Sequence, residues 1–266
     1  MRKIYVLMLF ALSLLAVSCS KEDTYDYPDD TYGVYIVNTE GGDLGMLLAK
    51  YDILLYPYIG VEGKLQYSDF QLLKHLQRAL MYLNLEKVTI DGYQKEDGEV
   101  IESNTLHQDH MQQNGRIAFP LLHTVILPRD LTEIGERTFY STNMTKLVAY
   151  NRLTTIGESA FENNIKLSEL NLPKSLKYIA ENAFKGCTSL TQVVIPSSVS
   201  VLYENSFDDR YVKSIHIKSK TPPELKETYD SSVKSASSKP TIYVPKGSLE
   251  RYKNDGVWKD YRIIEE

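Results

Sequence analysis

Short runs in which apolar residues alternate with other residues recur along the second half of the chain. Four such runs are Leu170-Asn171-Leu172-Pro173, Val193-Val194-Ile195-Pro196, Ile215-His216-Ile217 and Ile242-Tyr243-Val244-Pro245. Such alternation predicts a strand with one buried face. Three runs end in proline, which has no N–H to donate to a ladder and therefore ends the strand. The pattern predicts one short strand in each run.

A second pattern lies between these runs. Ile134-Gly135-Glu136-Arg137-Thr138-Phe139 is followed by Ile156-Gly157-Glu158-Ser159-Ala160-Phe161, then Ile179-Ala180-Glu181-Asn182-Ala183-Phe184 and Leu202-Tyr203-Glu204-Asn205-Ser206-Phe207. The phenylalanines are 22, 23 and 23 residues apart. This pattern predicts a tight turn and a short helical stretch, with each Phe pointing inward. In stacked repeats the four phenylalanines form an internal column.

The period lies in the range of leucine-rich repeats. A unit of this size cannot bury both of its faces alone, so the repeats are expected to stack. The predicted fold is an α/β leucine-rich-repeat solenoid, with parallel strands on one face and short helices and turns on the other. Residues 121–217 resemble the BspA-like leucine-rich-repeat family. Asn171 to Ile195 follow its unit through Pro173, Ser175, Leu176, Ile179, Ala183, Phe184, Cys187, Leu190 and Val193. At its place in this unit Cys187 is expected to be a small buried core residue.

The repeat weakens toward the N-terminus, where Ile59–Leu65, Leu80–Leu85 and Leu122–Pro128 match the strand pattern. Ser68 and Gln71 form a capping box that predicts a helix over 69–79, and Asp43 indicates a shorter helix before it. We expect one domain over 33–266, with an N-terminal cap at 33–58, repeats at 59–245 and a C-terminal cap at 246–266. Tyr93 to Gly115 and Ser219 to Lys239 are polar and are expected to be exposed loops.

The N-terminus has the pattern of a secretory signal, because Arg2 and Lys3 precede an apolar run from Ile4 to Val17. Leu15-Ala16-Val17-Ser18-Cys19 resembles a lipobox, with Ala16 where Leu is commoner. We therefore expect a lipoprotein signal peptide at residues 1–18, lipid attachment at Cys19 and an acylated tether at 19–32. Ser20-Lys21-Glu22-Asp23 resembles the acidic export signal of Bacteroides-type surface lipoproteins. The alternatives are an ordinary signal peptide with an incidental Cys, and a tether that is only solvated.

Composition and motifs argue against several classes of function. The formal net charge is −5 and no basic cluster is present, so nucleic acid is not expected as a partner. His107-Gln108-Asp109-His110 brings two imidazoles near a carboxylate, but no further His or Cys completes a zinc site. The chain has no phosphate loop and no nucleophile motif, so we expect no metal, no cofactor and no enzyme activity.

The outward side chains of the predicted strands form a grid with a spacing of about 4.8 Å. Its members are Tyr82, Asn84, Thr124, Ile126, Val148, Tyr150, Glu169, Asn171, Gln192, Val194, Ser214, His216, Thr241 and Tyr243. The BspA-like resemblance implies a non-catalytic adhesion or binding protein that attaches to host or neighbouring-cell macromolecules. Lipid anchorage would display it at the outer membrane, and the grid is the expected site for a protein or glycan ligand. The main alternative is an accessory subunit of an outer-membrane lipoprotein assembly. A third possibility is that the grid binds nothing, since a solenoid needs some face in water.

Overall fold

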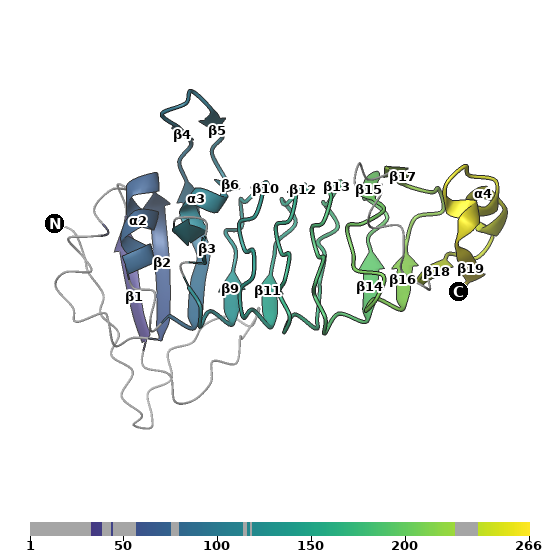
Figure 1. The fold of residues 1–266 in the computed structure, drawn as a ribbon. Helices are drawn as coiled ribbons and strands as arrows, with labels where there is room; N and C mark the ends of the chain where they lie inside the picture. Colours follow the sequence, from purple (N-terminus) through teal and green to yellow (C-terminus); the bar gives the residue numbers. More distant parts are fainter. Residues whose placement is uncertain are drawn as a thin grey trace, which may run out of the picture.

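The chain forms a parallel-strand solenoid, seen in a computed structural model that describes residues 33–38, 44, 57–75, 80–113, 116–117, 119–226 and 239–266. Successive repeats stack along one axis from the N-terminal end to the C-terminal end (Figure 1). The predicted leucine-rich-repeat architecture is therefore confirmed. The predicted signal peptide, Cys19, the predicted tether and most of the expected N-terminal cap lie outside the described residues.

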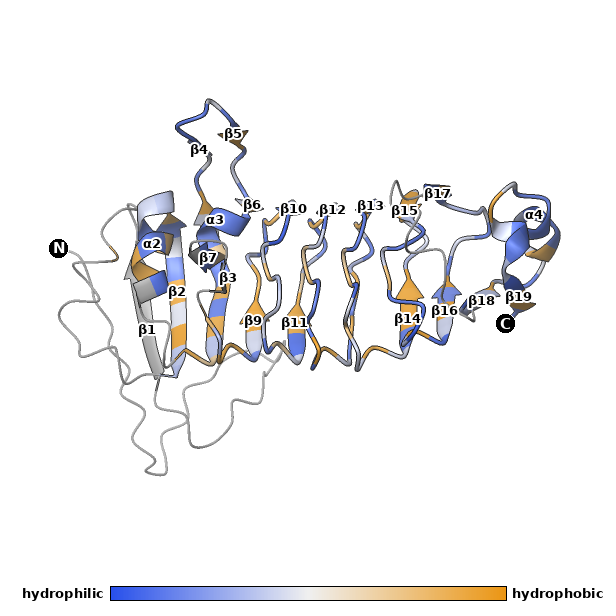
Figure 2. Ribbon diagram, viewed as in Figure 1, coloured by the Kyte–Doolittle hydropathy of each residue, from blue (hydrophilic) through white to orange (hydrophobic). Residues whose placement is uncertain are grey.

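One side of the solenoid carries the predicted strands, as two parallel sheets. The first has the order β1-β2-β3-β9-β11, with β1 at Gly33–Asn38, β2 at Tyr58–Leu65, β3 at Tyr82–Ile90, β9 at Thr124–Ile126 and β11 at Lys146–Val148. The second has the order β14-β16-β18-β19, with β14 at Gln192–Ile195, β16 at Ser214–Ile217, β18 at Thr241–Val244 and β19 at Arg262–Glu265. Hydrophobic residues recur along β2, β3, β9, β11, β14 and β16 in Figure 2, and alternate ones, such as Val193 and Ile195 of β14, belong to the core.

The opposite side differs from the prediction, because it holds a second kind of parallel sheet instead of short helices. Its order is β17-β15-β13-β12-β10-β6. The strands are β6 (Thr105–Leu106), β10 (Glu133–Ile134), β12 (Thr155–Ile156), β13 (Tyr178–Ile179), β15 (Val201–Tyr203) and β17 (Glu224–Lys226). Residues 119–226, described without a gap, contain no helix. Two features prevent a helix here. The Phe139 N–H donates to Ala160 O of the next repeat and not to a carbonyl of its own turn, and Ser159 has a left-handed φ of 52°.

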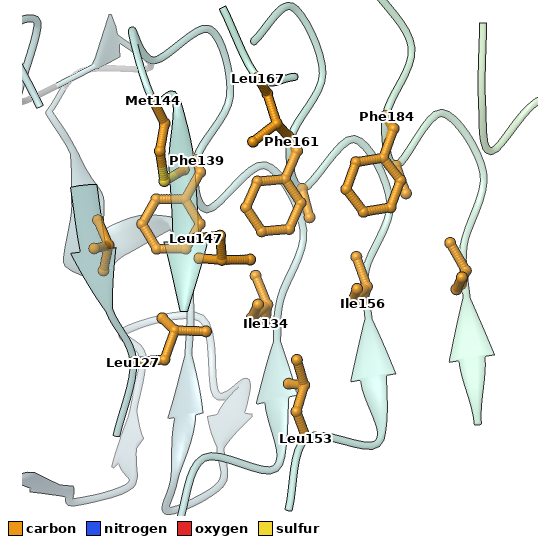
Figure 3. Close-up of a cluster of buried hydrophobic side chains, with 14 of the residues drawn as sticks. Leu127, Ile134, Phe139, Met144, Leu147, Leu153, Ile156, Phe161, Leu167 and Phe184 are labelled. Carbon is orange, nitrogen blue, oxygen red and sulfur yellow. The ribbon is translucent and has the colours of Figure 1, made fainter. Parts of the chain in front are cut away.

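The phenylalanine column is confirmed. Adjacent rings of Phe139, Phe161, Phe184 and Phe207 stack with centroids 5.4, 5.2 and 5.1 Å apart. Figure 3 shows three of these rings in a row, with Ile134 and Ile156 in a second row below them. Cys187 is also buried, as predicted, and its thiol donates to Phe161 O. Each repeat therefore contributes the same side chains to a core that is shared with its neighbours.

The N-terminal helix begins earlier than the capping box predicted. Helix α2 covers Tyr67–His75, and residues 76–79 lie outside the described part. The carboxylate of Asp69 accepts the Gln66 N–H at 2.9 Å and the Leu44 N–H at 3.1 Å. Asp69, in the first turn, therefore satisfies the backbone donor just before the helix in place of the predicted Ser68–Gln71 box, and its other oxygen binds Leu44 to the helix. Of the short helix expected after Asp43, only Leu44 is described.

The segment from Tyr93 to Gly115 is only in part the exposed loop that was expected. Strands β4 (Tyr93–Gln94) and β5 (Val100–Ile101) pair as an antiparallel hairpin that projects from the solenoid (Figure 1). The chain then rejoins the body at β6 and forms α3 at Gln108–Met111, followed by β7 (Gln112–Gln113) paired with β8 (Arg116–Ile117). His110 and Met111 of α3 are buried. The prediction was wrong for this part because buried residues, among them Ile101 and Leu106, are scattered through a polar sequence.

The C-terminal end closes the solenoid with α4 at Leu249–Lys253, a 3-10 helix (η3) at Trp258–Asp260 and β19. Tyr252 and Trp258 are buried, and the Trp258 indole N–H donates to Pro223 O at 2.8 Å. In the second expected loop, Glu224–Lys226 also forms a strand, and residues 227–238 lie outside the described part. The terminal segment thus adds a strand to the sheet and covers the end of the core.

Candidate binding face

The outward side chains of the two sheets that include β2 and β14 form one surface, here called the strand face. Strand register arranges them in two rows. The first row contains Tyr58, Tyr82, Thr124 and Lys146 on one sheet and Gln192, Ser214, Thr241 and Arg262 on the other. The second row contains Gly60, Asn84, Ile126 and Val148, then Val194, His216, Tyr243 and Ile264. Glu169 and Asn171 are exposed between the two sheets.

The C-terminal half of the strand face holds its side chains in fixed positions. The His216 and Tyr243 rings stack with centroids 4.5 Å apart and planes 7° apart. His216 Nδ1 lies 2.7 Å from a Glu266 carboxylate oxygen, and Nε2 lies 2.9 Å from the Gln192 side-chain nitrogen. The carboxylate accepts the Nδ1–H, which leaves Nε2 to accept a Gln192 N–H. The imidazole is therefore fixed by bonds on both nitrogens.

Glu266 also pairs with Lys218, whose Nζ lies 2.7 Å from Oε1. This hydrogen bond, aided by the one from His216, holds the pKa of Glu266 below its ordinary value. Around the stacked rings, Gln192 and Val194 are exposed and Ser214 and Thr241 are partly exposed. The C-terminal half of the strand face thus combines the ordered His216–Tyr243 pair with polar groups and the exposed Val194 side chain. This composition suits contact with a protein or a sugar.

In the N-terminal half, two predicted ligand-binding residues are not available to a ligand. Asn84 is buried, and its side-chain oxygen accepts the Glu86 N–H at 2.9 Å beside a β-bulge in β3. The side chain is therefore used locally to satisfy the irregular backbone. Ile126 is only 2% exposed, although it faces outward between Asn84 and Val148. The assignment of both residues to an exposed grid was wrong.

Tyr150 lies outside the rows where it was expected. The residue paired with Ile126 is Val148, so Tyr150 lies two positions beyond, in the turn that follows β11. The Arg129 guanidinium lies 5.0 Å from the centre of its ring and forms an ion pair with Glu86. Tyr150 therefore takes part in a contact between turns and does not extend the His216 row.

The remaining predicted positions keep some exposure. Glu169, Asn171, Gln192 and Val194 are exposed, and Tyr82, Thr124, Ser214, His216 and Tyr243 are partly exposed. The sequence prediction missed five members of the rows, namely Tyr58, Gly60, Lys146, Arg262 and Ile264. Tyr58 precedes the recognised run Ile59–Leu65, and Ile263-Ile264 is an apolar pair that could have indicated a last strand.

The two histidines of the insertion serve the local backbone. His107 Nδ1 accepts the Asp109 N–H, and His110 Nδ1 accepts the His107 N–H, so the two imidazoles form a capping box for α3. Burial lowers the pKa of His110 to about 3. Within the described residues, no three His, Cys, Asp or Glu side chains are placed to hold a metal ion.

These features define the class of the protein as a parallel-strand repeat solenoid with an extended side-chain grid. No helix in the described ranges is long and apolar enough to cross a bilayer. Residues 119–233 match, in six copies, the family described as BspA type Leucine rich repeat region. Residues 119–233 of this chain are thus similar to that leucine-rich-repeat family.

Comparison with curated proteins gave no match. Four chains of solved structures match, and one of them is the crystal structure of the pneumococcal vaccine antigen PcpA. Its sequence identity with this chain is 18% and the TM-score is 0.40. The match covers 78% of this chain and 59% of the PcpA chain, so this chain spans less than two thirds of that protein.

Proposed function

We propose that this protein is a non-catalytic adhesion or binding protein, held at the outer face of the outer membrane by acyl chains on Cys19, whose strand face binds an extended protein or glycan. The observation that carries the proposal is the strand register over β14, β16, β18 and β19. It sets eight outward side chains in two straight rows. Extended faces of this kind are the usual binding surfaces of solenoids.

The rings of His216 and Tyr243 are ordered before any ligand arrives, because the stack and the Glu266 and Gln192 contacts restrict their rotation. A surface that is already ordered loses little side-chain entropy on binding. Val194, which is 42% exposed beside His216, adds apolar area that a ligand would bury. We therefore expect the C-terminal half of the face to contribute most of the affinity.

The test begins with a protein and glycan array probed with the purified full chain. Val194→Glu and Asn171→Lys should each weaken the binding found there at least about tenfold, which corresponds to about 1.4 kcal/mol. Lys177→Glu is the matched control, because Lys177 is exposed in the turn before β13 on the opposite side. Glu181 would be a poor control, since its carboxylate accepts a hydrogen bond from Asn205.

Loss of binding in Lys177→Glu, with binding kept in both strand-face variants, would place the function on the other surface. A pull-down from intact outer membranes distinguishes an adhesin from an accessory subunit of a lipoprotein assembly. A stable endogenous lipoprotein partner favours an accessory subunit, and capture of host macromolecules favours the adhesin.

A further inference from the structure

The strand face is interrupted at one repeat in the middle of the solenoid. Residues 168–172, here called the unpaired rung, lie between β11 and β14 and belong to neither sheet. In other repeats of this face a backbone bond to the preceding repeat comes just before the strand: the Thr145 N–H donates to His123 O, and the Lys213 N–H donates to Thr191 O. In the continuously described range 119–226, no backbone hydrogen bond joins 168–172 to either neighbouring repeat.

The opposite side of the same repeats is continuous. Strand β13 pairs with β12 and β15, and the Lys177 N–H donates to Thr154 O at 2.8 Å. The backbone ladder beside the phenylalanine column also continues, since the Phe161 N–H donates to Ala183 O at 2.8 Å. The rings of Phe161 and Phe184 stay 5.2 Å apart. The molecule is therefore held together on one side of the unpaired rung and open on the other.

The sequence of the unpaired rung accounts for the interruption. Leu170, Asn171 and Leu172 occupy the places of Val193, Val194 and Ile195 in the next repeat. β-Branched residues favour strands, and Asn disfavours them. Leu170 and Leu172 are also only partly buried, whereas Val193 and Ile195 are 1% and 0% exposed. These side chains therefore anchor their backbone to the core less firmly.

We propose that the unpaired rung is a hinge about which the two halves of the strand face change their relative angle. The continuous second sheet and the phenylalanine column form the hinge line, so the motion opens and closes the strand face without sliding one repeat over another. A ligand that spans both halves would select one angle, and a ligand confined to β14–β19 would not. The proposal does not depend on the identity of any ligand.

Amide hydrogen exchange on the full chain tests the local part of this proposal. Peptides covering 168–172 should exchange at least about tenfold faster than peptides covering 214–217, which belong to β16 and are paired on both sides. Equal protection of the two segments would overturn the proposal, because a hinge requires that the ladder be missing in solution as well.

Nitroxide pairs test the motion between the halves, in the full chain carrying Cys19→Ser. The remaining Cys187 is buried and its thiol pKa is raised to about 12, so it resists labelling. Labels at Thr124→Cys and Gln192→Cys lie three repeats apart across the unpaired rung. The control pair, Gln192→Cys and Arg262→Cys, lies three repeats apart within one sheet. Both separations are about 14 Å, within reach of dipolar broadening in continuous-wave spectra.

The distance between the two nitroxides should be distributed distinctly more broadly for the cross-hinge pair, Thr124→Cys with Gln192→Cys, than for the control pair. The triple variant Leu170→Val, Asn171→Val and Leu172→Ile should narrow that distribution to the width of the control. A cross-hinge distribution as narrow as the control overturns the hinge, even if 168–172 exchange rapidly. A broad distribution that the triple variant leaves unchanged overturns its assignment to these three side chains.

Discussion

The ring of Phe184 lies parallel to the ring of Phe161, with 1° between their planes and 5.2 Å between their centres. Both side chains are fully buried, and Phe184 stacks in the same way on Phe207. Phe184 is therefore shared by three repeats. Its contacts are the clearest case in this molecule of a core that no single repeat could form.

Removal of this shared ring should destabilise the whole solenoid. We expect Phe184→Ala to lower the free energy of unfolding by about 3 to 5 kcal/mol, because the cavity lies between repeats that hydrogen bonds keep in place. Phe207→Ala should cost less, since Phe207 is 4% exposed and has one phenylalanine neighbour. Urea unfolding followed by circular dichroism measures both. Equal losses below about 1 kcal/mol would contradict a packed column.

The buried His110 should make the N-terminal part of the protein sensitive to acid. Burial lowers its folded-state pKa to about 3, whereas the unfolded value is near 6.5. The unfolded state therefore binds the proton first, and stability that is complete above pH 6.5 is lost as the pH falls toward 3. Between pH 6.5 and 5 the expected loss is about 2 kcal/mol.

Urea unfolding at several pH values checks this prediction, with His110→Leu as the comparison. The variant loses the acceptor for the His107 N–H, so it should be less stable at pH 7.5. Its stability should nevertheless depend less on pH over the same interval. A wild-type curve that is flat between pH 6.5 and 5 would show that His110 is not held neutral.

The C-terminal end should depend on Trp258. Its ring is buried and its N–H donates to Pro223 O, so Trp258→Phe keeps most of the packing and leaves one buried acceptor without its donor. We expect a loss of about 1 to 3 kcal/mol for Trp258→Phe and about 3 to 5 kcal/mol for Trp258→Ala. Lys259→Ala, an exposed neighbour, should change stability by less than about 0.5 kcal/mol. Thermal unfolding measures these losses, and equal melting temperatures for all three variants would contradict the prediction.

Lipid anchorage is tested by Cys19→Ala. The thioether at this position is the only anchor in the proposal, so the variant should remain uncut or leave the membrane fraction. Cell fractionation and metabolic labelling with a fatty acid measure the two effects. If Cys19→Ala partitions with membranes as the wild type does, the lipoprotein proposal fails. Cys187→Ala serves as the control, because its buried thiol takes no part in anchoring.

The sequence by itself was enough to predict the solenoid, the phenylalanine column and the buried Cys187. All three depend on contacts between residues about one repeat apart, such as Phe161 with Phe184. Where each unit packs on a copy of itself, the spacing of Phe, Ile and Leu already states which side chains meet. The same spacing predicted the rows that contain Val194 and His216.

Only the tertiary structure decided which of these side chains are available to a ligand and where the ladder stops. Asn84 accepts the Glu86 N–H at a bulge, the Tyr150 ring lies beside the Arg129 guanidinium, and residues 168–172 join neither sheet of the strand face. The second sheet replaced the expected helices because the Phe139 N–H has a partner in the next repeat. Except for the Tyr150 ring contact, these outcomes depend on which backbone donors and acceptors the adjacent repeats leave unsatisfied, and the folded chain as a whole decides that.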